Sequence, residues 1–154
     1  MGIVLVLMGK YLYLVVILLA IVFVLLQPRE TQKKMLMLAV ITLPLTYIVA
    51  WVAGHLYYDP RPFVAEHIQP LIVHAANNGF PSDHTLITSA LAAVIFIYNR
   101  KWGIGLGMLA LLVGVGRIYA RIHSPIDILG SFVISGIVVA VVALSLRKFS
   151  RLKI

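Results

Sequence analysis

Long hydrophobic stretches recur along this chain, each about the length of a membrane-spanning helix. A helix needs about 20 mostly apolar residues to cross the hydrocarbon core of a bilayer. The stretches near that length are residues 10–27, 35–56, 79–98, 102–120 and 127–146. Hydrophobic residues make up 62% of the chain, whereas soluble domains are about half apolar. The pattern predicts an all-α fold: an integral membrane helical bundle of about five transmembrane helices.

The five helices use up the chain, so we expect residues 1–154 to form a single membrane-embedded domain. Residues 1–27 have an apolar core longer than that of a signal peptide and no cleavage site of small residues, which predicts a retained helix. The absence of cysteine excludes disulfides, thiolate nucleophiles and Cys-based metal sites.

The net charge of +8 follows membrane orientation rather than nucleic-acid binding, because the cations gather at helix ends and form no exposed stripe. One set of ends carries Arg29, Lys33, Lys34, Arg100, Lys101, Arg147, Lys148, Arg151 and Lys153. The positive-inside rule makes this side cytoplasmic. The opposite ends carry Lys10, Arg61, Arg117 and Arg121. The loops on that side are therefore predicted to face outward, with a site at the outer membrane–water interface.

The link between the last two predicted helices combines an arginine, a histidine and an aspartate. Arg117 precedes His123 by six positions, and Asp127 follows His123 by four. Pro125 suits the first position of a helix, which places Asp127 in its first turn. Asp127 alone would be equally consistent with a role confined to that helix start. With His123 in register, however, a carboxylate bonded to one imidazole nitrogen leaves the other free as a nucleophile.

A second motif, Phe80-Pro81-Ser82-Asp83-His84, leads into the third predicted helix. Ser82 is placed to cap this helix, and the backbone N–H groups of Asp83 and His84 point out of its start. A helix N-terminus binds anions readily. We therefore expect a phosphate-binding site here, with His84 placed to protonate a leaving oxygen.

A third motif holds Arg61 between Pro60 and Pro62, which stiffen the loop around it. An arginine binds phosphate through a bidentate fork, and at a membrane edge it also binds lipid head groups. The remaining histidines and acids have no such context, and we interpret them as surface residues: His55, His67, His74, Glu30 and Glu66.

Together these motifs resemble those of the type-2 phosphatidic acid phosphatase superfamily, which is related to vanadium haloperoxidases. The resemblance covers about residues 50–146 and rests on three strings in the family's order and spacing: Arg61-Pro62, Pro81-Ser82-Asp83-His84, and Arg117 with His123 and Asp127. Within the family, the fuller string is most similar to bacterial undecaprenyl-diphosphate phosphatases: Arg61 to Val64, then His74, Ala75, Asn77 and Phe80 to Thr85.

The resemblance implies a mechanism without metal or cofactor. His123 would attack phosphorus and form a phosphohistidine, and Asp127 would orient it. His84 would protonate the leaving group and later help to activate water. The phosphate oxygens would be bound by the side chains of Arg61, Ser82, Arg117 and Arg121. The backbone N–H of Asp83 at the helix start would bind them as well.

The chain departs from the family in two ways. The lysine that usually stands seven residues before the motif arginine is Gly54 here. We expect Arg121, one turn from Arg117, to supply the missing cation in preference to Lys10. Family members also commonly have six spans, whereas this sequence predicts five.

The resemblance implies a lipid phosphatase or diphosphatase of a bacterial cytoplasmic membrane, acting on undecaprenyl diphosphate in the outer leaflet. Lipid A at its 1-phosphate and phosphatidylglycerophosphate are alternative substrates. A lipid phosphotransferase and a non-catalytic lipid-binding or transport protein are alternatives of other classes. The expected partners are the substrate lipid and the bilayer; the sequence indicates neither nucleic acid nor an obligate protein partner.

Overall fold

The computed structural model of the chain describes residues 2–151, with side chains through residue 148. Helices form all of its regular structure, and residues 2–151 contain no β-strand. The helices are α1 (Gly2–Leu25), α2 (Arg29–Leu56), α3 (Pro62–Ala65), α4 (Asp83–Tyr98), α5 (Arg100–Tyr119) and α6 (Pro125–Arg151). The expected all-α bundle is confirmed.

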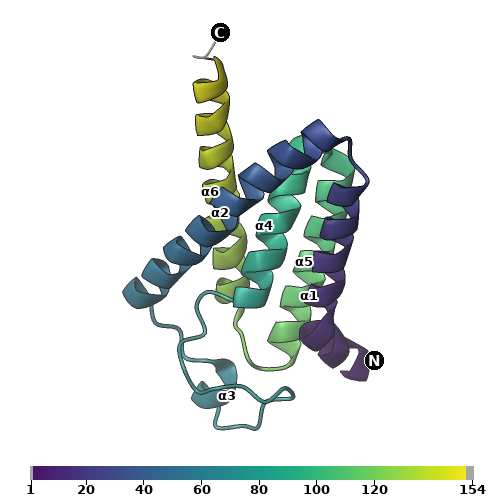
Figure 1. Ribbon diagram of the computed structural model, residues 1–154. Helices are drawn as coiled ribbons and strands as arrows, with labels where there is room; N and C mark the ends of the chain where they lie inside the picture. The colour runs from purple at the N-terminus through teal and green to yellow at the C-terminus, as the bar shows by residue number, and fades with distance from the viewer. Residues whose placement is uncertain (1, 152–154) are drawn as a thin grey trace.

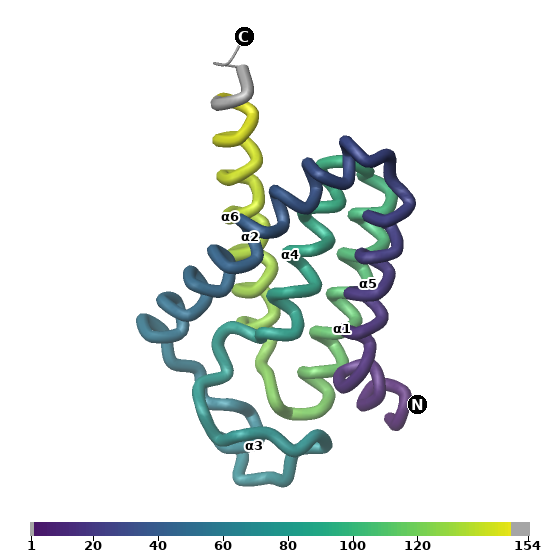
Figure 2. Tube along the Cα trace, viewed as in Figure 1, coloured from purple at the N-terminus to yellow at the C-terminus, as the bar shows by residue number. Residues whose placement is uncertain are grey.

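The five long helices run alternately up and down, and the loop that contains α3 covers one end of the bundle (Figure 1). The N-terminus lies at the same end as this loop, and the C-terminus lies at the other. Helix α2 crosses the bundle obliquely and diverges from α1 after their short connection, as the chain path in Figure 2 shows. Because α1 and α2 make few contacts with each other, the bundle is open between them.

Helix α4 is the centre of the bundle, because it packs against α1, α2, α5 and α6. Two apolar clusters lie on opposite sides of it. The first joins α4 to α1, α2 and α5 through Val16, Ala20, Phe23, Met35, Ala92, Ile95, Leu106 and Val113. The second joins α4 to α2 and α6 through Leu38, Val94, Val138, Val139 and Val142. A hydrogen bond of 2.8 Å between the hydroxyls of Ser89 and Ser135 also links α4 to α6.

Four helices, α1, α2, α5 and α6, are long and apolar enough to cross a membrane. The fifth predicted span is shorter than expected: α4 has 16 residues, a rise of about 24 Å against about 30 Å of hydrocarbon. It starts at Asp83 rather than at residue 79 because Phe80 precedes a proline, which disfavours helix. The chain is a multi-pass membrane protein.

Helix α1 begins earlier than the sequence pattern predicts. It extends from Gly2 through Lys10, the residue at which the predicted span of residues 10–27 begins. The side chain of Lys10 is exposed and lies over the ring of Tyr11, 5.1 Å from its centroid. A lysine on a helix surface can extend its chain along apolar neighbours and keep its ammonium in water, so it need not end the helix.

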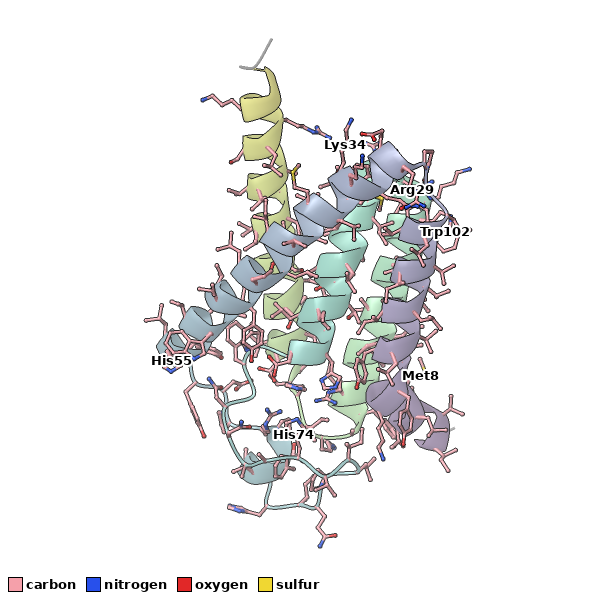
Figure 3. All side chains as sticks on the ribbon, viewed as in Figure 1. Met8, Arg29, Lys34, His55, His74 and Trp102 are labelled. Carbon is pink, nitrogen blue, oxygen red and sulfur yellow. The ribbon has the colours of Figure 1, made fainter. Side chains whose placement is uncertain are left out.

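The predicted separation of charge is visible in the bundle. Figure 3 labels Arg29 and Lys34 at the end away from the loop that contains α3. Arg61 directly precedes α3, and Arg117 lies in the last turn of α5, at the end covered by that loop. Lys153 and the side chain of Arg151, which we assigned to the basic end, lie outside the described residues.

The amide side chain of Asn78 fastens the loop between α2 and α4 to the end of α2. Its nitrogen donates to the carbonyls of Gly54 and Tyr57 at 2.7 and 2.9 Å. Its oxygen accepts from the backbone N–H groups of Asp59 and Phe80 at 2.9 and 3.0 Å. Asn78 thereby holds the motif that contains Arg61 next to the motif that begins at Phe80, about 20 residues further along the chain.

Candidate active site

His123 and Asp127 form a buried pair at the start of α6. The Nδ1 atom of His123 lies 3.0 Å from Oδ2 of Asp127, and the two residues are 2% and 0% exposed. The same oxygen accepts from the backbone N–H of Ser124 at 2.9 Å, as expected for a carboxylate in the first turn. Because a carboxylate only accepts, Nδ1 carries the proton and Nε2 keeps its lone pair. The predicted orientation of His123 is present in the geometry.

Arg61 lies directly against this pair. Its Nη1 donates to the carbonyl of Ile122 at 2.7 Å and lies 3.3 Å from Nε2 of His123. Its Nε donates to Oδ1 of Asn77 at 2.9 Å, and its Nη2 donates to the carbonyl of Asn78 at 3.2 Å. The guanidinium is thus fixed by the loop and bonded to the nitrogen that would act as the nucleophile.

Arg117 approaches from the last turn of α5 and is 3% exposed. Its Nη1 donates to the carbonyl of Gly9 on α1 at 3.4 Å. Its Nη2 lies 3.2 Å from Nε2 of His74. Three buried polar atoms of the cluster lack a partner among the described residues: Nε of Arg117, Oδ1 of Asp127 and Nδ1 of His74. Arg117 therefore keeps a donor free for a ligand.

His74 corrects our interpretation of it as a surface histidine. Its side chain is half-buried under α5, and its ring lies 6.1 Å from that of His123, centroid to centroid. Nothing in its local sequence indicates this position; the one signal was its place in the string shared with the undecaprenyl-diphosphate phosphatases. His74 lies in the cluster because the loop folds back beneath the helix ends (Figure 3).

The start of α4 completes the cluster. Ser82 is the residue before the helix and is fully buried, but its hydroxyl makes no cap bond and instead accepts from the Thr85 hydroxyl at 3.2 Å. Its backbone N–H donates to the Asp127 carbonyl at 3.4 Å, which joins α4 to α6. Asp83 is exposed, and its charge reaches both Arg61 and Arg117. His84 is near enough to Arg117 for the charge of the guanidinium to act on it.

Arg121 is placed elsewhere. Its guanidinium pairs with Glu66 at 3.2 Å, and its side chain is 53% exposed. Glu66 is exposed in the loop, as expected for a surface residue. The geometry gives no support to Arg121 as the substitute for the family lysine.

Gly54, the residue at the lysine position, is enclosed by the loop. A Cβ atom placed on Gly54 would lie 2.8 Å from the carbonyl oxygen of Phe80, too close for the backbone to stay in place. The space beyond the Cα atom of Gly54 is thus occupied by the segment that leads into α4.

The environment keeps His123 and His74 neutral near pH 7. Burial lowers the pKa of His123, although its hydrogen bond to Asp127 opposes this. Burial and the charges of Arg61 and Arg117 lower the pKa of His74 to about 4. A neutral His123 with a free lone pair on Nε2 is the form that can attack phosphorus.

The family model described as the PAP2 superfamily matches residues 34–151. The chain belongs to the PAP2 superfamily. The match includes all three motifs, α2 from residue 34 onward and helices α3 to α6, whereas α1 lies outside it. The predicted family is confirmed.

Three relatives illustrate the place of the chain within the PAP2 superfamily. Undecaprenyl-diphosphatase BcrC of Bacillus subtilis is 38% identical over 70% of this chain and 55% of its own length. YbjG of Escherichia coli, which carries the undecaprenyl-diphosphatase name provisionally, is 34% identical over 64% of this chain and 50% of its own. Bacitracin transport permease protein BcrC of Bacillus licheniformis is 32% identical over 65% of this chain and 50% of its own length.

The chain therefore spans about half the length of the curated relatives it matches. No solved structure matches it.

Proposed function

We propose that this protein hydrolyses the terminal phosphate of a membrane lipid through a phosphohistidine at His123, with undecaprenyl diphosphate as its substrate. The observation that carries the proposal is the buried His123–Asp127 pair, which leaves Nε2 of His123 as a lone-pair nitrogen beside the guanidinium of Arg61. The substrate is chosen because relatives at 38% and 34% identity carry the undecaprenyl-diphosphatase name.

In the first step, Nε2 of His123 attacks the terminal phosphorus, and the bond from phosphorus to the bridging oxygen breaks. Arg61 leaves Nε2 and binds a non-bridging oxygen, together with Nε of Arg117 and the hydroxyl of Ser82. His84 donates a proton to the departing lipid phosphate. These donors stabilise charge in the transition state, which is where most of the catalysis of phosphoryl transfer lies.

In the second step, water attacks the phosphohistidine, and the P–N bond breaks. His84, now neutral, takes a proton from the attacking water. Inorganic phosphate leaves, and Nε2 of His123 regains its lone pair. The balanced reaction consumes one water and releases lipid monophosphate and inorganic phosphate.

A lipid substrate is supported by an apolar groove that begins at His84. The part next to the site has a volume of about 240 Å³ and is lined by α1, α2 and α4. A deeper part of about 500 Å³ continues between the same helices and shares Ile17 and Leu43 with the first. A polar cavity of about 230 Å³ adjoins the groove at Asp83 and is lined by Arg61 and Asn77. A long tail fits the groove while its head group faces the cavity.

The first test is phosphate release by the purified protein in detergent with EDTA present. Undecaprenyl diphosphate, lipid A and phosphatidylglycerophosphate would be compared, with His123→Ala as the inactive control and Tyr11→Ala as a control on an exposed side chain. Release that requires His123 and is fastest with undecaprenyl diphosphate is the expected result. Lipid binding that persists in both variants without release by the wild-type protein would favour a binding or transport protein.

The proposal also places the site outside a bacterial cytoplasmic membrane. The helix ends rich in lysine and arginine lie at the opposite end of the bundle from the site, and the positive-inside rule makes that end cytoplasmic. Ala76→Cys lies in the exposed part of the loop and should react with an impermeant thiol reagent applied to intact cells. Labelling only after lysis would contradict the orientation.

A further inference from the structure

Helix α1 contributes to the candidate active site although it lies outside the part of the chain that matches the PAP2 superfamily. Gly9 and Gly116 let α1 and α5 approach so closely that a Cβ atom on either would lie within 2.7 Å of the other's backbone. Small residues at a crossing permit such contact between membrane helices. The approach brings the carbonyl of Gly9 to Arg117 at 3.4 Å.

One turn further along α1, Tyr13 meets His84. The two rings are T-shaped, with centroids 4.4 Å apart and an angle of 82° between the planes. Tyr13 is half-buried and packs against the apolar cluster that joins α4 to α1, α2 and α5. Edge-to-face packing of this kind is directional and favours one orientation of each ring.

The imidazole of His84 has no hydrogen bond to any residue that the structure describes, in contrast to His123, which is held by Asp127. The bond recorded at His84 involves its backbone carbonyl, which accepts from the Thr88 hydroxyl at 2.8 Å. The ring of Tyr13 therefore packs edge-to-face against an imidazole that no hydrogen bond orients.

We propose that Tyr13 is a positioning residue that holds the imidazole of His84 toward the leaving oxygen. The proposal rests on the function proposed above, in which His84 is the proton donor. A general acid must lie about 2.6–3.2 Å from the atom it protonates, and a misplacement of about 1 Å can cost about 100-fold in rate. A ring without a hydrogen-bond partner depends on packing for this accuracy.

The test is a double-mutant cycle measured as phosphate release from undecaprenyl diphosphate. Tyr13→Ala should lower kcat by about 10- to 100-fold and change KM less than about twofold. Tyr13→Phe, which keeps the ring, should retain activity. In the His84→Ala background, Tyr13→Ala should change the residual kcat less than about twofold, because a residue that acts only through His84 has nothing left to position.

Tyr11→Ala is the matched control, because Tyr11 is an exposed tyrosine of the same helix. Tyr13→Leu replaces the alanine variant if the latter does not fold, since leucine keeps an apolar side chain against the core. An equal loss of kcat in the presence and absence of His84 would mean that Tyr13 only supports the fold, and would overturn the proposal. Unchanged kcat in both Tyr13→Ala and Tyr13→Leu would overturn it as well.

Absence of turnover by the wild-type protein would be a different result. It would contradict the proposed function, and the role of Tyr13 would fall with it.

Discussion

Replacement of Gly54 by lysine restores the residue that the family usually has at this position. The structure nevertheless predicts that the lysine side chain clashes with the loop and lowers turnover. The first side-chain atom would lie 2.8 Å from the carbonyl oxygen of Phe80, whereas ordinary contacts begin at 3.4 Å. Phe80 leads directly into Ser82 and His84, so any displacement of the loop moves the start of α4. We expect Gly54→Lys to lower turnover by about tenfold rather than to raise it.

The cost of the clash at Gly54 can be measured separately from any effect of the lysine charge by replacing Gly54 with alanine. Overpacking costs about 1–3 kcal/mol, and alanine is favoured over glycine in a helix by about 1 kcal/mol. Gly105→Ala on α5 is the matched control, because its added Cβ meets nothing within 4 Å. The propensity gain is common to both variants, so Gly54→Ala should be less stable than Gly105→Ala by about 1–3 kcal/mol.

Thermal unfolding in one detergent measures this difference, which corresponds to a melting temperature about 2–12 °C lower for Gly54→Ala. Phosphate release from the lipid substrate measures turnover of Gly54→Lys. A lysine variant that melts at the wild-type temperature and turns over faster would refute the reasoning. It would mean that the loop at Phe80 yields and that the lysine reaches the phosphate.

Arg121→Ala should change turnover less than about twofold, because Arg121 pairs with Glu66 away from the site and exposed ion pairs contribute only about 0–1 kcal/mol to stability. A tenfold loss in phosphate release would mean that Arg121 does bind the substrate phosphate. Asn78→Ala should lower the free energy of unfolding by about 2–4 kcal/mol, since it removes four hydrogen bonds, and a loss below about 1 kcal/mol in thermal unfolding would contradict this. Burial lowers the pKa values of His74 and His123, to about 4 for His74, so the unfolded chain takes up protons below about pH 6.5 while the folded chain does not. Stability should therefore be full above pH 6.5 and fall as the pH drops toward 4; melting temperatures that rise on acidification would disprove the assignment.

The parts of the site that depend on helix starts could be predicted from sequence. Asp127 lies in the first turn of α6, and that position alone brings its carboxylate to His123. The backbone of α4 starts where the motif places it, immediately after Ser82. Local geometry of this kind is fixed by a few residues, so a motif predicts it directly.

The parts that depend on tertiary packing could not be predicted. Arg121 was expected one helical turn from Arg117, but α5 ends at Tyr119 and Arg121 has a φ of 63°, which turns its side chain toward Glu66. His74 reaches Arg117 because a loop without periodic pattern folds back under α5. Nothing in the sequence of either residue records these distant partners.

In the proposed mechanism, the bond between Arg61 and Nε2 of His123 affects which lipids can reach the nucleophile. In the absence of substrate, the reactive nitrogen is already engaged by a cation. A neutral lipid that fills the groove brings nothing to exchange for that cation, and the nitrogen stays engaged. A phosphate can accept the guanidinium in its place and thereby expose the nitrogen. Rejection of the abundant neutral lipids around the protein thus requires no recognition of their tails.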